Sequence, residues 1–474
     1  MKVKNFFRKL KNINPKYYAI FFACFISIGF GLSDYDYFWQ CLLGKYYLNG
    51  EGFYASRFLS WGTLGKEPYL DHEWLSNIIL YLFNSIGDYG ALIMKLVLCT
   101  LVGFTTVKYV KKFNASKYGY KFYVLILDIC LVAGLLYKIK PYMFSIVFLM
   151  LEILMLYEYE EKKNLKESII KSTILVLLWN NMHSGSVPLY FAIAGLFWLT
   201  HLRERKSIFL GIYNVALLGI NPYGFKLILF DLAHNSEKIM KLYNKDWQPL
   251  DTKNVQSIVL SIVVLSIIYL CCTHKIKRDL FAIIGLIAIL FIGFGSLRHL
   301  MYILPFIIII LHNMEIERVE NVFTTRIVTL VIISFFLLNI TSVLVKGNFK
   351  QNYLAVHIDD ELGNLLQETV TEPEGFFVDA DMNEIMYYGL TPFYSGAYPE
   401  SPSRCNDAYF MNNFASPQHI SEIIDYYGFN KFLVTKYSIY EGYLVTGTLY
   451  DYLYNNDKYV ILYDNDFCAY FVER

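Results

Sequence analysis

Two carboxylates stand directly after the first apolar run of this chain. Asp34 and Asp36 follow the run Tyr17–Leu32, and the aromatic residue Trp39 comes soon after them. Carboxylates close to the hydrocarbon of a bilayer are costly, and they are found mostly where they have a function. The alternative is that both aspartates only mark the boundary with water, with Trp39 in an interfacial aromatic belt.

His72 and Glu73 form a second titratable pair, just before the apolar stretch Trp74–Phe83. That stretch is too short to cross a bilayer, so we predict a helix that lies along the interface. Glu73 together with Asp34 and Asp36 is a candidate site for Mg²⁺ or Mn²⁺, because carboxylate-rich sites suit these ions. These residues alone do not establish a cofactor.

Cations and hydrogen-bonding side chains are found in other predicted outer turns. Lys140, Arg298 and His299 come from turns on the same predicted side of the membrane, where they could stabilise an anionic group or simply contact lipid headgroups. His183 precedes small residues and is either a hydrogen-bonding site residue or a buried structural histidine. Trp247 could stack on a sugar or anchor the chain at the interface.

The elements that must carry these residues are mainly apolar helices. Of the 474 residues, 55% are hydrophobic and 18% are charged, whereas soluble domains carry about 25% charged residues. The mean hydropathy is +0.36. The net charge of +1 favours no nucleic-acid partner, because no single sign of charge dominates. We therefore predict an all-α integral membrane protein.

About eleven apolar runs are candidates for crossing the hydrocarbon core, which takes about 20 helical residues. They lie near 17–33, 89–108, 122–138, 142–157, 169–183, 187–202, 207–221, 254–272, 280–297, 299–313 and 326–345. Alternate connections are short and mostly rich in Lys or Arg, which places the N-terminus in the cytoplasm. The long outer loops are then 33–90 and 221–253, where a membrane enzyme can build a site.

The composition changes in the last part of the chain. Short apolar runs, such as 375–378 and 431–434, alternate with helical patterns there, and the segment 459–472 has the pattern of a hairpin. We predict a transmembrane domain at 1–345 and a small extracytoplasmic α/β domain at 346–474. Packing or recognition of an acceptor is the role we expect for the latter.

Two acidic residues, Asp128 and Glu152, lie inside predicted spans. Ionisable groups at such positions are functional candidates by default. We nevertheless expect a structural role first, with each carboxyl group hydrogen-bonded to a partner in the interior of the bundle.

The motifs, in their order along most of the chain, resemble a group of bacterial multi-pass membrane proteins. That group is similar to the GT-C superfamily of glycosyltransferases, which use polyprenyl-phosphate sugars and include the protein O-mannosyltransferases and the aminoarabinose transferases. The matching motifs are Asp34-x-Asp36 with Trp39, Asp71-His72-Glu73-Trp74-Leu75, Lys140-Pro141, Trp179–Gly185, Asn221-Pro222-Tyr223-Gly224 and Arg298-His299.

The resemblance implies a mechanism and a set of site residues. Asp36, with Asp34 second, would remove the proton of an acceptor hydroxyl as that hydroxyl attacks the sugar with inversion. The donor's lipid would lie in the bilayer, and the acceptor would be an envelope glycan, lipid or protein. The donor phosphate would be bound by Lys140, Arg298 and His299, and substrate contacts would come from His72, Glu73, Trp39, His183 and Trp247.

Two positions depart from the pattern of that group. Gln40 stands where relatives often have His, and Arg57 stands where Asp precedes the Phe-Ser segment. If these changes abolish the chemistry, the chain is a catalytically silent scaffold in envelope assembly. A lipid or solute transporter is the third alternative, which the absence of an evident inverted repeat disfavours.

Overall fold

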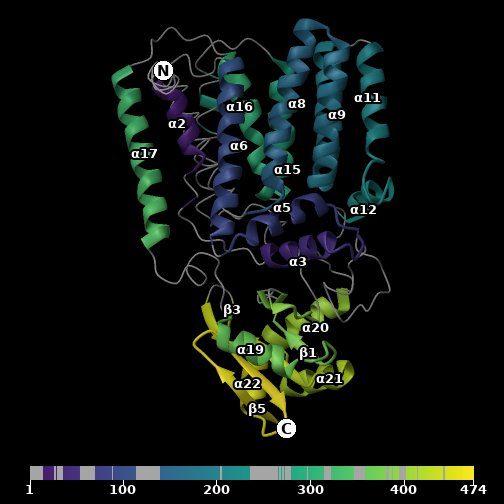
Figure 1. Cartoon of the computed structure of the whole chain (residues 1–474), viewed down its shortest axis with the longest axis vertical. Coiled ribbons are helices and arrows are strands. Elements are labelled where there is room, and N and C mark those ends of the chain that lie inside the picture. The colour runs from purple at the N-terminus through teal and green to yellow at the C-terminus, as the bar shows by residue number, and fades with distance from the viewer. Residues whose placement is uncertain are drawn as a thin grey trace. The chain divides into compact units, whose positions relative to one another are not determined.

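The computed structural model (Figure 1) is mostly helical, with a small mixed sheet. Contacts divide the chain into two compact units, and each is described by itself. The residues that the structure describes are 14–25, 28, 36–53, 70–87, 89–113, 139–202, 205–234, 265, 268–269, 272, 279–295, 297–313, 322–345, 358–379, 384–386, 388–393, 402–413, 415–440 and 443–474.

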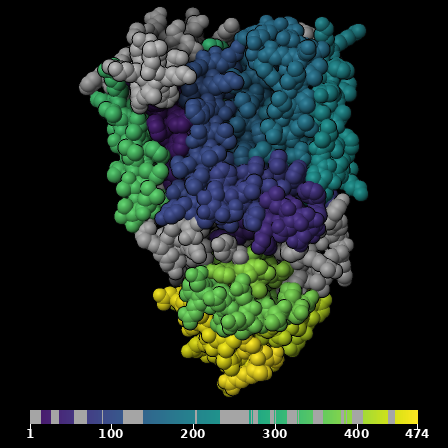
Figure 2. All heavy atoms as spheres, viewed as in Figure 1, coloured from purple at the N-terminus to yellow at the C-terminus, as the bar shows by residue number. Residues whose placement is uncertain are grey.

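The first unit, which we name the helical unit, comprises Met1–Leu32, Ile86–Ser236 and Lys245–Phe349. Among the α-helices of its described residues lie the 3₁₀ segments η3 and η6 and a π-helical turn, η4. Helices α6, α8 and α9 pack in sequence, and Figure 2 shows their side chains across one face of this unit. The bounds are α2 (Pro15–Ala23), α6 (Gly90–Phe113), α8 (Tyr142–Lys162), α9 (Leu165–Met182), η3 (Ser184–Ser186), α10 (Val187–Phe197), η4 (Trp198–Leu202), α11 (Arg205–Leu217), α12 (Lys226–His234), α15 (Leu280–Gly295), η6 (Leu297–Ile303), α16 (Leu304–His312) and α17 (Val322–Val345).

The turn between α8 and α9 shows how local sequence sets the ends of these helices. Lys163 adopts the left-handed conformation, with φ 52°, and so ends α8. Asn164 then caps α9, because its side-chain oxygen accepts a hydrogen bond of 3.2 Å from the Glu167 amide. Lys171 of α9 joins the two helices through an ion pair of 2.6 Å to Glu158 of α8, and it also pairs with Glu167 on its own helix at 2.6 Å.

Membrane-spanning character is present in part of the chain. Within the described residues, α6 and α8 are long and apolar enough to cross a membrane. Helix α9 and Ser184–His201 pass the same test together, but they are bent by 119°, so they add a third span only if both belong to one crossing. Shorter apolar helices are Trp74–Asn84, Leu280–Ile292, Met301–His312 and Thr329–Val345.

The predicted runs near 89–108 and 142–157 coincide with α6 and α8. The predicted total of about eleven spans is not shown by the described part of the chain. The predicted run near 122–138, with Asp128, lies outside it, as does most of the run near 254–272.

The second unit, which we name the sheet unit, comprises Ser33–Ser85, Glu237–Asn244 and Lys350–Arg474. Its first helices are α3 (Asp36–Leu48) and α5 (Trp74–Asn84), which pack against each other. A Cβ atom on Gly44 of α3 would lie 2.1 Å from the Asn77 carbonyl oxygen, so only glycine permits this close approach. Helix α5 confirms the helix predicted over Trp74–Phe83.

The rest of the sheet unit contains the small α/β fold that the sequence predicts. Its main sheet has the strand order β1-β2-β6-β5, with β1 and β2 parallel and the other pairs antiparallel. Phe377, Phe432 and Phe471 lie in its apolar core. The bounds are α19 (Asp360–Thr369), β1 (Phe376–Val378), α20 (Pro402–Asn413), α21 (Pro417–Tyr427), β2 (Lys431–Thr435), β3 (Tyr437–Tyr440), β4 (Tyr443–Thr446), α22 (Thr448–Tyr454), β5 (Tyr459–Asp464) and β6 (Cys468–Glu473).

Candidate functional site

A fully buried carboxylate joins α3 to α5 in the sheet unit. Asp71 accepts hydrogen bonds of 2.7 Å from the Tyr47 hydroxyl, 2.7 Å from the Asn77 side-chain amide and 2.9 Å from the Glu73 backbone amide. Burial raises the pKa of Asp71 to about 6, against the opposing effects of the Tyr47 hydrogen bond and of nearby His72. This carboxylate fixes the backbone that carries the predicted pair His72 and Glu73.

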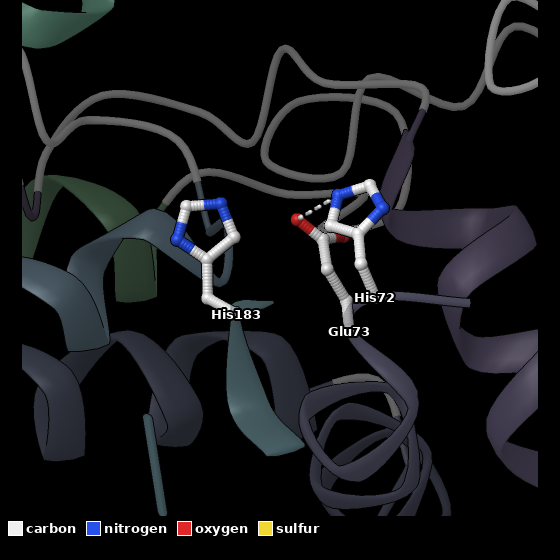
Figure 3. A group of neighbouring side chains, drawn as sticks. All are labelled: His72, Glu73 and His183. Carbon is white, nitrogen blue, oxygen red and sulfur yellow. Dashed lines mark ion pairs between the residues drawn. The ribbon is translucent and has the colours of Figure 1, made fainter. Parts of the chain in front are cut away.

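The predicted pair is itself in contact. His72 Nε2 lies 3.5 Å from Glu73 Oε1, as the dashed line in Figure 3 shows. The other Glu73 oxygen accepts a hydrogen bond of 2.8 Å from the side-chain amide of Gln40 on α3. Gln40 therefore binds Glu73 directly and holds one of its two oxygens.

Asp36 is the first residue of α3, where its negative charge complements the positive end of the helix dipole. The indole N–H of Trp39, which is buried, donates a hydrogen bond of 3.1 Å to Asp36 Oδ1. Trp39 thus orients the predicted catalytic carboxylate. Asp34 lies outside the described residues, so the predicted ligand set of Asp34, Asp36 and Glu73 is described only for the latter two.

The helical unit contains a cavity of about 300 Å³ lined by two of the predicted site residues, His183 and His299. Tyr142, Tyr302 and Ser186 add hydroxyl groups to the lining. The other lining residues are apolar or small: Gly185, Pro188, Leu189, Ala192, Leu232, Ile289, Ile292 and Met301. The cavity therefore combines a few polar groups with an extended apolar wall, as ligand sites for amphipathic molecules do.

Two serines of the helical unit hold the imidazole of His183, which Figure 3 labels. Its Nδ1 lies 2.6 Å from Ser145 Oγ and 2.9 Å from Ser186 Oγ. The indole N–H of Trp179 donates to Ser186 at 2.7 Å and to Ser145 at 3.2 Å. A hydroxyl can donate to Nδ1 or accept from it, so this arrangement accommodates either tautomer of the ring.

Neighbouring contacts keep the bend between α9 and α10 in place. Ser184 donates a hydrogen bond to the Asp231 carboxylate of α12, and both side chains are buried. The side-chain amides of Asn180 and Asn181 donate to the carbonyl oxygens of Leu218 and Ile220 at 3.2 and 3.0 Å. His183 is thus a buried, structurally fixed histidine that also lines the cavity.

The remaining predicted residues are placed only in part. Lys140 is half-buried and lies two residues before Tyr142, which lines the cavity. Only the backbone of Arg298 is described, and Trp247 lies outside the described residues.

Sequence reasoning missed the groups that orient the site residues. Ser145 lies 38 positions before His183, and Tyr47 lies 24 positions before Asp71, so no local pattern connects them. Ser186 is closer, three residues after His183, but a serine after a helix end is common enough to carry little signal.

Comparison with protein families and with curated proteins identifies no relative of this chain. No protein-family model matches the chain, and no curated protein matches it.

Proposed function

We propose that this chain is an inverting membrane glycosyltransferase that moves a sugar from a polyprenyl-phosphate donor to an acceptor in the cell envelope. The observation that supports the proposal best is the cavity of about 300 Å³ in the helical unit. A lipid-linked substrate has an apolar chain and a polar head, and this lining offers Leu189 and Ile292 for the first and His183 and His299 for the second.

The proposal keeps the topology predicted above, with about eleven spans, a cytoplasmic N-terminus and the α/β domain on the outer side. Asp36, with Asp34 as second choice, is the general base. Lys140, Arg298 and His299 neutralise the departing phosphate. A divalent cation bound by the carboxylates of the first outer loop would help to neutralise the same phosphate.

Donor binding tests the role of the cavity. Ala192 of α10 lines it, whereas Ala194 of the same helix does not. We expect Ala192→Trp to weaken binding of a radiolabelled polyprenyl phosphate to nanodisc-embedded protein at least tenfold, because the indole fills the apolar part of the cavity. Ala194→Trp is the matched control and should bind as the wild type does. If both variants bind polyprenyl phosphate equally well, the cavity is not the donor site.

Sugar transfer tests the base. In nanodiscs supplied with radiolabelled polyprenyl-phosphate hexoses and extracted envelope acceptors, Asp36→Asn should lose at least 100-fold in transfer, since an amide cannot accept the proton. Asn retains an oxygen that can accept the Trp39 hydrogen bond, so the local fold should survive. The exposed Glu51→Gln is the control. Full activity of Asp36→Asn would contradict the assigned role.

The two alternative functions have distinct outcomes in the same preparation. A lipid or solute transporter would move label across sealed vesicles without forming a transfer product. A scaffold would bind envelope components and do neither.

A further inference from the structure

A buried acid lies at the middle of α8, away from the cavity. Glu152 is fully buried, and neither of its carboxyl oxygens has a hydrogen-bond partner among the residues that the structure describes. Ten helical residues separate it from Tyr142 at the cavity, a rise of about 15 Å along the axis. The expected hydrogen bond of Glu152 to a partner in the bundle is therefore absent within this described part of the chain.

Polar groups from the neighbouring helices α9, α10 and α11 form a connected chain near this acid. Helix α10, which carries Tyr190, packs against α8. The Tyr190 hydroxyl accepts a hydrogen bond of 2.6 Å from the side-chain amide of Asn214 on α11, and Asn214 accepts one of 3.1 Å from Ser172 on α9. All these side chains are buried.

Among the described residues, no group beside Glu152 would offset the charge of a carboxylate. An ionised carboxylate in an apolar interior needs an ion pair or several hydrogen bonds to offset its lost hydration. In the described part of the chain Glu152 has neither a hydrogen bond nor an ion pair. A protonated carboxyl group carries no net charge, so its burial costs far less.

A purely structural role does not account for an acid at this position. A residue whose only task is to fill the space between α8 and α10 would be more stabilising if it were apolar, because burial of an unbonded polar group is unfavourable. Ionisable groups inside spanning helices mark proton or ion sites by default.

We propose that Glu152 is a proton-binding site inside the helical unit, with Tyr190, Asn214 and Ser172 as the polar groups on the facing helices. The ligand is a proton, held on the carboxyl group at neutral pH. This inference is independent of the proposed sugar transfer, because it rests on contacts that do not involve the cavity.

Infrared spectroscopy of the whole protein in nanodiscs tests the assignment, since a protonated carboxyl group and a carboxylate absorb in separate regions. At neutral pH, the difference spectrum between the wild type and Glu152→Gln should contain the carbonyl band of one protonated acid. Glu158→Gln, on the same helix, is the matched control: Glu158 is paired with Lys162 and Lys171, so its removal should take away carboxylate bands instead. Loss of carboxylate bands in Glu152→Gln would overturn the proposal.

A second variant keeps the test decisive if Glu152→Gln fails to fold. Protein labelled with ¹³C-glutamate identifies the acid bands that come from glutamate, and Tyr190→Phe removes the polar group on the facing helix. We expect Tyr190→Phe to shift one ¹³C-sensitive acid band. An unchanged set of acid bands in Tyr190→Phe, or no such band in the labelled wild type, would contradict the assignment.

Discussion

Asp71 shows how a buried residue outside the predicted site set can support that site. Its carboxylate accepts from both Tyr47 and Asn77. Asp71→Ala would leave these two donors buried without an acceptor, and each such loss costs about 1–3 kcal/mol. We therefore expect a clear fall in thermal stability, measured by intrinsic fluorescence in detergent. The free energy of unfolding of Glu51→Ala, at an exposed residue, should lie within about 0.5 kcal/mol of the wild-type value. Equal stability of the two variants would contradict this role for Asp71.

The same residue predicts a pH dependence of stability. Burial raises the pKa of Asp71 from 3.8 to about 6, so the folded protein binds this proton more tightly than the unfolded chain does. The contribution of Asp71 to stability is therefore greatest below about pH 4 and is lost as the pH rises to about 6. The melting temperature of the wild type relative to Asp71→Asn should fall across this interval and stay level above it. A constant difference from pH 4 to pH 7 would show that the proton is not linked to folding.

At the scale of elements, the contact between α3 and α5 depends on one glycine. Gly44→Ala would place a methyl group 2.1 Å from the Asn77 carbonyl oxygen, and such overpacking costs about 1–3 kcal/mol. Gly211 of α11 is the matched control, because no atom lies within 4 Å of its added Cβ. Gly211→Ala should be neutral or stabilise by up to about 1 kcal/mol. Chemical denaturation measures the free energy of unfolding of both variants. An unchanged free energy of unfolding in Gly44→Ala would mean that α3 and α5 can move apart without loss of stability.

Individual elements of this chain could be predicted where the local pattern is strong. The apolar runs at 375–378 and 431–434 became β1 and β2, and the terminal hairpin became β5 and β6. Their alternation and turn residues are local properties, so sequence alone carries them. The bend of 119° after α9 and the Gln40–Glu73 bond were not predicted, because both depend on contacts between distant segments.

The same limit applied to the candidate site. Residue type indicated His72, Glu73, His183 and His299, and the structure pairs the first two and places the other two at one cavity. Sequence could not supply the orientation of these groups, which Asp71, Ser145 and Trp179 provide from elsewhere in the chain.

For the whole molecule, the predicted topology places the α/β domain outside the cell and the α8–α9 turn inside. Tyr426 and Lys166 are both exposed, so a cysteine at either position can react with a maleimide. In a background in which Cys130, Cys271, Cys272 and Cys405 are Ser, we expect Tyr426→Cys to be labelled in intact cells by an impermeant maleimide. Lys166→Cys should be labelled only after the membrane is opened. The reverse labelling pattern would mean that the predicted topology is inverted, and it would exclude the proposed reaction on the outer face.

The hydrogen-bonded chain of Ser172, Asn214 and Tyr190 also constrains how this protein can evolve. An apolar residue in place of Asn214 alone would take away the donor to the buried Tyr190 hydroxyl and would leave Ser172 only its bond to the Ile169 carbonyl. Exchange of all three for apolar residues need not be costly. A single substitution in this trio is therefore destabilising, whereas the protein with all three residues replaced is stable. Descendants of a common ancestor should then inherit the three positions as a block, and substitutions among them should appear together on the same branches of a phylogeny.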